Sequence, residues 1–347
     1  ALTEASYKSK GSEIELKQLV INDRIIKTGH DIEIESDYFN AKVIGRTSLL
    51  EAPYAFLHVG HRYLPTFIPQ VDVSNLDTLQ DFLFEFDIEN NDALISLLSS
   101  DLKLDNSLHV NGGLKMKGND FNLKTDTLSW SFGNTKFLGN TIEVYPANRD
   151  LVAKTHIQKL QLTEQYSIEG INGVADIRYD SVLLNADWAG TSDLTDKGQV
   201  SVMLYRTDLM PWNLDLNKLN VDILGSEWRS VKKAKFSADS LQINVNHLEL
   251  VSEDGLISGD GVLSKKKPTR LDLNVQNFDL SYLSGFSVVQ QSLNGVLNGH
   301  IDVGYVKERL VVDGDIIIDS LFLDEQEIGN VNGEATYNSQ MNVVDVN

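Results

Sequence analysis

The sequence contains no cysteine, so neither a disulfide framework nor a cysteine-ligated zinc site can form. No run of about 18 apolar residues occurs, which is the length that a transmembrane helix needs. Only 6 prolines occur among 347 residues, so few positions are barred from a β-ladder. The start, Ala1–Glu4, is polar and lacks a signal-peptide pattern. We therefore expect any export signal or membrane anchor to lie outside this chain.

Basic residues are scarce. The chain has 30 Lys and Arg against 50 Asp and Glu, a formal net charge of -20. Nucleic acid binding requires clustered Lys and Arg, so this charge argues against it. It argues equally against simple adsorption to an anionic membrane surface. Acidic surface charge is what keeps a long sheet soluble, and we favour that explanation over binding of a basic partner.

Short stretches that alternate apolar and polar residues fill the chain. Leu241–Asn246 (LQINVN) and Leu271–Gln276 (LDLNVQ) show the pattern most clearly. Such a period of two predicts strands with one dry face and one wet face. Strands recur about every 8 to 12 residues, with Gly, Asn or Asp between them, which predicts an all-β protein. No fixed-length repeat of the solenoid or propeller kind is present.

A few segments depart from the alternation. Leu49–Pro69 contains three prolines and is expected to be a loop or an edge. A short helix is predicted after Ser74, which can cap a turn with Asp77. A second is predicted from Asp92 to Leu98, where leucines and an isoleucine have helical spacing. Leu280–Phe286 predicts a single helical turn.

The chain lacks a clear linker, and its organisation is read from soft boundaries. Asn111–Gly113 (NGG) predicts a hairpin turn between two short strands. The expected organisation is an irregular N-terminal β segment with short helix over 1–90, the main β modules over 91–290, and a further, truncated repeat over 291–347.

Roughly twenty antiparallel strands exceed the ten or so that an open twisted sheet usually holds before it curls, splits or closes. Stacked sandwiches, a closed barrel and a sheet curled into an open hydrophobic groove therefore remain as solutions. A groove would expose a continuous apolar surface suited to acyl chains, since each methylene kept from water is worth roughly 0.8 kcal/mol. Alternation alone does not separate the groove from the sandwich.

Two stretches near the C-terminus resemble the repeated pattern of the TamB family of the bacterial envelope: Gly295–Gly304 (GVLNGHIDVG) and Val312–Ile318 (VDGDIII). Leu271–Leu283 is similar, and Leu128–Phe137 more loosely so. AsmA-like proteins look alike at this level. The resemblance extends from about Leu241 onward and, less closely, from about Asp101.

This resemblance implies an elongated periplasmic β-groove (a β-taco) that moves phospholipid toward the outer membrane without enzymatic activity. It also implies a BamA-like outer-membrane partner and an inner-membrane anchor outside this chain. We expect the acyl chains to contact alternate apolar residues of the strands. The predicted lining comprises Phe84, Phe86, Val202, Leu204, Leu241, Ile243, Val245, Leu271, Leu273, Val275, Ile301, Val303, Ile316 and Ile318.

Two alternatives stay open: a β-sandwich scaffold or adhesin without lipid, and a carbohydrate-active β enzyme. No GxSxG, P-loop or HExxH motif occurs, and no acid pair stands out among 50 acidic residues. His58 and His61 have metal-ligand spacing but lack further donors, so loop histidines are expected. Asp313–Asp315 (DGD) is expected to be a turn and not a calcium site. Lys265–Pro268 is expected to be a solvated hairpin tip, and no cofactor is predicted.

Overall fold

The structure, a computed structural model, confirms the all-β class, with 71% of residues in strands and 6% in helices. It describes residues 2–9, 12–74, 76–90, 95, 99, 101–162, 167–189, 197–207, 210–223, 225–266, 269–285, 292–306, 309–324, 326–338 and 343–346. All strand pairings among these residues are antiparallel and mostly join strands that are consecutive in the chain.

The chain divides into two compact units. Unit 1 comprises Ala1–Leu162 and Ser167–Val182, and unit 2 comprises Thr163–Tyr166 and Leu183–Asn347. The three-part organisation expected from the sequence stays a prediction.

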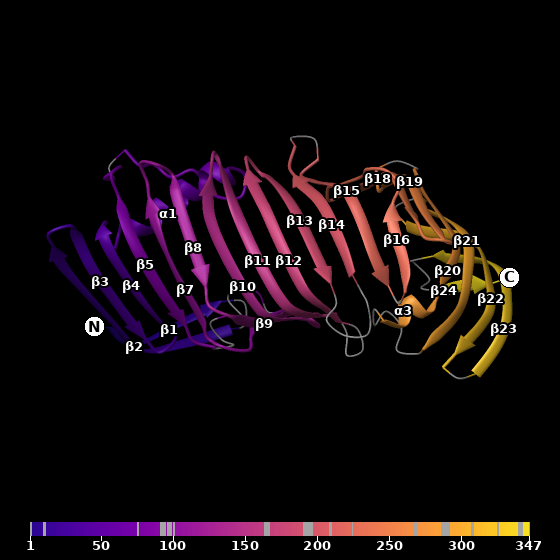
Figure 1. The fold of residues 1–347 in the computed structure, drawn as a ribbon, viewed down its shortest axis with the longest axis horizontal. Helices are drawn as coiled ribbons and strands as arrows, with labels where there is room; N and C mark the ends of the chain where they lie inside the picture. Colours follow the sequence, from indigo (N-terminus) through magenta and orange to yellow (C-terminus); the bar gives the residue numbers. More distant parts are fainter. Residues whose placement is uncertain are drawn as a thin grey trace. The chain divides into compact units, whose positions relative to one another are not determined.

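Unit 1 is an antiparallel sheet with one long helix (Figure 1). Its elements are β1 (Leu2–Ser9), β2 (Ser12–Ile26), β3 (Gly29–Ser36), β4 (Phe39–Arg46), α1 (Ala52–Tyr63), β5 (Asp81–Ile88), β6 (Leu102–Leu104), β7 (Leu108–Lys115), β8 (Asp120–Thr125), β9 (Leu128–Phe132), β10 (Thr135–Ala147), β11 (Asp150–Gln161) and β12 (Ser167–Arg178). Strand β13 (Ser181–Ala189) is divided between the units: Ser181 and Val182 belong to unit 1, and the rest belongs to unit 2.

Unit 2 is a second antiparallel arrangement with one short helix. Its elements are β14 (Lys197–Tyr205), β15 (Trp212–Ile223), β16 (Ser226–Ser230), β17 (Ala234–Ala238), β18 (Gln242–Val251), β19 (Leu256–Ser264), β20 (Arg270–Asp279), α3 (Ser281–Gly285), β21 (Leu293–Val306), β22 (Arg309–Leu323), β23 (Gln326–Asn338) and β24 (Val343–Val346). Strands β15 and β18 each pair with both short strands β16 and β17.

Helix α1 corrects the expectation of a loop or edge over Leu49–Pro69. Pro53 stands in its first turn, where a residue without an N–H is tolerated because that donor has no partner within the helix. The buried residues Ala52, Ala55, Val59 and Tyr63 follow helical spacing and form one face. The prolines therefore mark the start of a helix and the loop that follows it.

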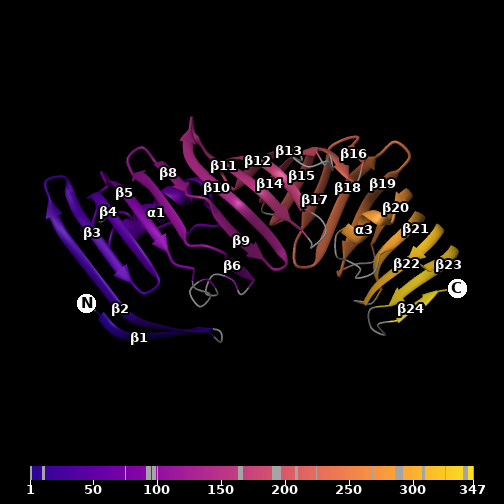
Figure 2. The same ribbon diagram turned by 60° about the horizontal axis from the view of Figure 1, so that its bottom comes forward.

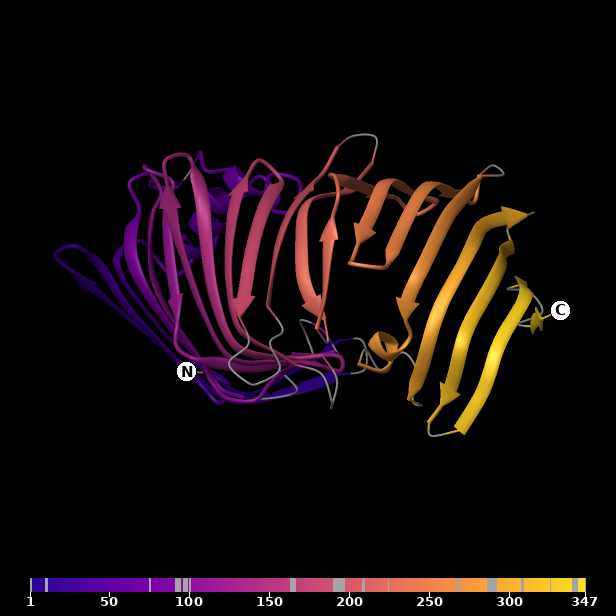
Figure 3. The same ribbon diagram turned by 45° about the vertical axis from the view of Figure 1, so that its right-hand side comes forward.

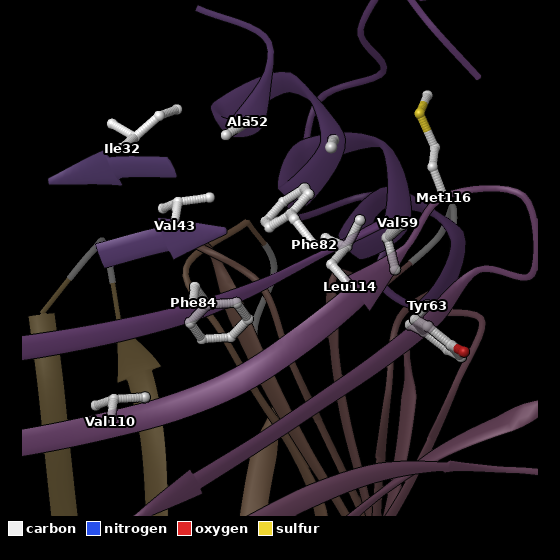
Figure 4. Packing of buried hydrophobic residues seen from close by; sticks show 11 residues of the cluster. Ile32, Val43, Ala52, Val59, Tyr63, Phe82, Phe84, Val110, Leu114 and Met116 are labelled. Atoms are coloured by element: carbon white, nitrogen blue, oxygen red, sulfur yellow. The ribbon is translucent and has the colours of Figure 1, made fainter. Parts of the chain in front are cut away.

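The buried side of α1 packs on one face of the sheet in unit 1. Figure 4 shows Phe82 and Leu114 from β5 and β7 lying close to Val59 of the helix, with Ile32 and Val43 on neighbouring strands. Phe82 is 1% exposed. The half-buried Phe56 of α1 meets the Phe82 ring edge-on, with centroids 5.6 Å apart. This part of the sheet is closed by protein.

The hairpin turn predicted at Asn111–Gly113 is wrong, because β7 runs straight through it. The glycines serve close packing instead. A Cβ on Gly112 would lie 2.2 Å from the carbonyl oxygen of Asn122 and 2.5 Å from Cζ of Phe84. The chain turns after β7, where Asn119 adopts a positive φ of 51°.

The helix predicted after Ser74 is also wrong. Asp72 Oδ1 accepts the Ser74 N–H and Asp77 Oδ1 accepts the Leu79 N–H, so these side chains stabilise two turns instead of a helix start. Most of the second predicted helix, Asp92–Leu98, lies outside the described residues. The predicted helical turn over Leu280–Phe286 is confirmed by α3, with Phe286 itself outside the described part.

Candidate functional site: the apolar face of unit 2

The strand register of unit 2 places large apolar side chains on one face. Residues that pair directly in an antiparallel ladder lie on the same face of the sheet. Following the pairs from β14 to β22, one set of partners contains the following residues: Val202, Leu204, Leu214, Leu216, Phe236, Ile243, Val245, Leu263, Leu271, Leu273, Val275, Ile301, Val303, Val312, Ile316 and Ile318. We call this set the apolar face.

The other face of the same strands is polar. One row across β15, β17 and β18 joins Asp215, Lys235 and Asn246. A second row runs across β19 to β22 and is made of four directly paired aspartates: Asp260, Asp272, Asp302 and Asp313. Asp260, Asp272 and Asp302 also lie within 4 Å of His247, His300 and Arg270, so this face carries polar and charged groups that are costly to remove from water.

Three β-bulges of one design interrupt β18, β20 and β22. In each, a residue of positive φ stands at the bulge: His247 at 59°, Asn277 at 49° and Ser320 at 51°. Its backbone N–H is accepted by a side-chain oxygen of the next strand, from Asp260, Asn298 or Asn330, at 2.8 to 2.9 Å.

The bulges keep the apolar face continuous along each strand. The register shifts between Val245 and Leu248, and between Val275 and Phe278, so residues three apart stay on the same side. A bulge also bends and twists its strand. Figure 3 shows the yellow strands β22 and β23 curving along their length.

Helix α3 covers one end of the apolar face. Its Tyr282 meets Phe278 edge-on at 5.4 Å and lies 6.4 Å from Trp228 of β16, measured between ring centroids. Leu280, Tyr282 and Trp228 are buried. Figure 2 shows α3 lying close to β20. This end resembles the closed core of unit 1.

The opposite end of the apolar face is exposed to solvent. Leu204 at the end of β14 is 41% exposed, Ile243 at the start of β18 is 45% exposed, and Trp212 at the start of β15 is 57% exposed. Leu241, which precedes β18 and was predicted to line the site, is also exposed. These exposed apolar side chains lie on neighbouring strands at one edge of the sheet, and apolar surface gathered in this way is typical of binding sites.

The register thus brings together the predicted lining residues of unit 2. Of those twelve, Val245 is buried and the others are half-buried or exposed. The two predicted in unit 1 are placed differently. Phe84 is 4% exposed beneath α1, with its ring centroid 5.1 Å from that of Phe56, and Phe86 packs at the margin of the same core. Phe84 is thus part of a protein-filled core.

Several members of the apolar face were missed from the sequence. Leu214, Leu216, Phe236 and Leu263 occupy it beside the predicted residues. Leu214 and Leu216 carry the same period-two signal as their neighbours and could have been included. Trp212 gives no such signal, because nothing in its local pattern distinguishes an exposed ring from a buried one.

Within the described part of the chain, two groups bring one His and two carboxylates within 4.8 Å: Glu85, Asp87 and His109, and Asp272, His300 and Asp302. In each group the imidazole nitrogens face carboxylate oxygens, as in an ion-paired histidine. Arg270 Nη1 also lies 2.9 Å from Asp302 Oδ2.

The other metal candidates are placed by secondary structure. His58 and His61 lie on α1, not on a loop as expected, and His61 Nδ1 is 2.6 Å from the carbonyl oxygen of Ile68. Asp313–Asp315 lies inside β22, so the turn expected there is wrong. Lys265 and Lys266 follow β19 at a bend, while the rest of that run lies outside the described residues.

The His109 pair makes stability depend on pH. A hydrogen bond to Asp87 raises the pKa of His109 above its usual value. A raised folded-state pKa contributes stability that is complete below about pH 6.5 and is lost as pH rises through the raised value. His109→Asn should therefore lower the free energy of unfolding by on the order of 0.5–1 kcal/mol more at pH 5.5 than at pH 9, measured by urea denaturation.

His156 supplies the matched control for this prediction. Its Nδ1 lies 2.9 Å from Oδ1 of the Asn172 amide, not a carboxylate. His156→Asn should show no comparable excess at pH 5.5. Equal effects of His109→Asn at the two pH values would contradict the assignment.

The fold and the face define an all-β antiparallel protein with a sealed core beneath α1 and a partly open apolar surface on unit 2. No family model, curated protein or solved structure matches this chain. Among the described residues, no helix has the length and apolar character that crossing a bilayer requires.

Proposed function

We propose that the protein is a non-enzymatic lipid conduit that shelters acyl chains on the apolar face of unit 2. The observation that carries this proposal is the exposed end of that face, where Leu204, Trp212 and Ile243 are 41%, 57% and 45% exposed. Covering a sixteen-carbon tail is worth about 12 kcal/mol at roughly 0.8 kcal/mol per methylene. The apolar face supplies that cover, and the opposite face of the same strands is polar and hydrated.

The chemistry of the face suits acyl chains better than a polar ligand. Its paired members from β14 to β22 are aliphatic or aromatic, with small residues between them. Apolar side chains offer no directional hydrogen bonds, so such a face accepts acyl chains of different lengths. A catalytic role would need polar groups converging on this surface.

The cellular setting rests on the resemblance to the TamB family. On that basis the lipid is a phospholipid that moves through the periplasm between the inner and outer membranes. The conduit would be tethered to the inner membrane by a segment outside this chain. It would work with a BamA-like outer-membrane protein and aid outer-membrane biogenesis.

Photo-crosslinking tests the proposal directly. A photoreactive amino acid at Ile243, on the apolar face, should capture phospholipid when the chain is expressed in a bacterial envelope. The same probe at Asn246, which is exposed and paired with Lys235 on the polar face, should not. Equal yields at the two positions would refute a lipid site on this face.

A β-sandwich scaffold or adhesin without lipid is the second candidate. The core beneath α1 favours it, because that part of the sheet is covered by protein side chains, as in a sandwich. If that function holds, the exposed end of unit 2 meets another protein and neither probe captures lipid.

A further inference from the structure

The exposed end of the apolar face carries two cation–ring pairs. Arg206 lies over the ring of Trp212, with Cζ 5.6 Å from the ring centroid. Lys265 lies over the ring of Tyr305, with Nζ 5.9 Å from the centroid. The four residues come from strand ends that the sheet register places along one edge of unit 2, where β14, β19 and β21 end and β15 begins.

All four residues continue the alternation of the apolar face. Arg206 follows Leu204 by two residues, Lys265 follows Leu263, and Tyr305 follows Val303. Trp212 pairs with Ala238, which in turn pairs with Ile243 of the face. The aliphatic surface therefore ends in two amphipathic rings and two cations. We call these four residues the basic–aromatic edge.

Among the described residues at these strand ends, cations outnumber carboxylates. The net charge is -20, yet Arg206, Lys265 and Lys266 lie at these strand ends. The nearby Asp239 contributes one negative charge, and its Oδ1 accepts the N–H groups of Leu241 and Gln242 at 2.6 and 2.7 Å. The hydrogen bond from the Leu241 N–H holds the pKa of that carboxyl below its usual value.

The two ends of the face thus differ in chemistry. The α3 end is closed by packed aromatic side chains, whereas the basic–aromatic edge carries two cations, with Trp212 and Lys265 exposed and Arg206 and Tyr305 half-buried. Trp and Tyr rings beside Arg and Lys are the residues that proteins place where hydrocarbon meets lipid headgroups. Arg and Lys also supply the donors that phosphate oxygens require.

We propose that the basic–aromatic edge holds the phosphate headgroup of an anionic phospholipid whose tails lie on the apolar face. This inference rests on the proposed lipid-binding function. It adds a preference for headgroup charge: the cations attract a headgroup that is net negative more strongly than a zwitterion, whose own ammonium opposes them. The orientation follows, with headgroup at this edge and tails directed toward α3.

Binding to the whole chain of two lipids with identical tails tests the inference. Phosphatidylglycerol and phosphatidylcholine, each with the same fluorescent tail, are titrated in detergent below its micelle concentration. Arg206 and Lys265 are each expected to favour phosphatidylglycerol over phosphatidylcholine by up to about 1 kcal/mol of binding free energy. Together they predict a preference for phosphatidylglycerol of about tenfold. The double variant Arg206→Gln with Lys265→Gln should reduce that preference to near unity and leave phosphatidylcholine affinity within about twofold.

The matched control removes the same charges elsewhere on unit 2. Arg229→Gln with Lys235→Gln changes two exposed residues whose strand partners, Asn220 and Asp215, place them on the polar face. This variant should keep the tenfold preference. An equal loss in the control variant would overturn the headgroup assignment.

The outcomes separate the two proposals. If the wild-type chain binds both lipids equally well, the headgroup inference is wrong and lipid binding stands. If the preference survives in the edge variant, the cations that carry it lie elsewhere and the inference is again wrong. If neither lipid binds to the wild-type chain, the proposed function fails and the inference fails with it.

Discussion

Ile243→Asp and Leu204→Asp should each weaken acyl-chain binding by about a hundredfold or more. In the lipid-free protein both side chains are more than a third exposed, so an aspartate there stays hydrated and the sheet still folds. When tails cover the face, the carboxylate must lose its water without gaining a partner, at a cost of roughly 3 kcal/mol or more. Transfer of a fluorescent phospholipid between vesicles measures the loss.

The control for this prediction places the same new charge on the other side of β18, the strand that carries Ile243. Asn246→Asp adds a carboxylate to the hydrated polar face and should leave transfer within about twofold of the wild-type rate. Circular dichroism verifies that all three variants keep their strand content. Unchanged transfer in both Ile243→Asp and Leu204→Asp would show that tails do not lie on this face.

Phe82→Ala should lower the stability of unit 1 by about 3–5 kcal/mol. Phe82 is 1% exposed, and its removal leaves a cavity between β5 and α1 together with the loss of its edge-on contact with Phe56. Hydrogen exchange of the amides of β3 to β8, followed in mild urea, reports the local free energy of opening.

Leu83→Ala is the matched control, since Leu83 is the next residue of β5 and is 66% exposed. It should change the exchange of the same amides by no more than about 0.5 kcal/mol. Amides of β20 to β22 in unit 2 should be unaffected by either substitution. A cost for Phe82→Ala below about 1 kcal/mol would mean that α1 does not seal this core as the structure describes.

The contrast between the two units supports the functional account. Both present alternating apolar residues from antiparallel strands, so the sequence pattern is alike. In unit 1 the twelve-residue amphipathic helix α1 lies on part of that face, and Phe82, Phe84 and Leu114 beneath it are buried. In unit 2 the five-residue α3 covers one end, and large side chains remain exposed at the other. The open end of unit 2 therefore follows from the short length of α3 and not from the alternating pattern.

The strands and their faces could be predicted because period-two alternation needs no knowledge of distant contacts. Leu271, Leu273 and Val275 each lie on the apolar face of β20, as their spacing indicates. The register then confirms that strands far apart in the sequence present the same side. The curled groove is a different matter, since alternation is the same in a sandwich, and that shape stays a prediction.

What could not be predicted depends on tertiary contacts. The three prolines of Leu49–Pro69 predict a loop or an edge, but Pro53 stands in the first turn of α1, where a helix tolerates proline. Gly112 was interpreted as part of a turn, but the backbone of Asn122 and the ring of Phe84 come too close for any side chain. The exposure of Trp212 likewise depends on which other elements pack against it, and the local sequence pattern does not encode those contacts.

Mass spectrometry of lipids that co-purify with the chain from a bacterial envelope tests the central claim most directly. The account predicts bound phospholipid in at least stoichiometric amount, reduced strongly by Ile243→Asp and not by Asn246→Asp. A folded wild-type chain that carries no lipid under the same conditions would contradict it.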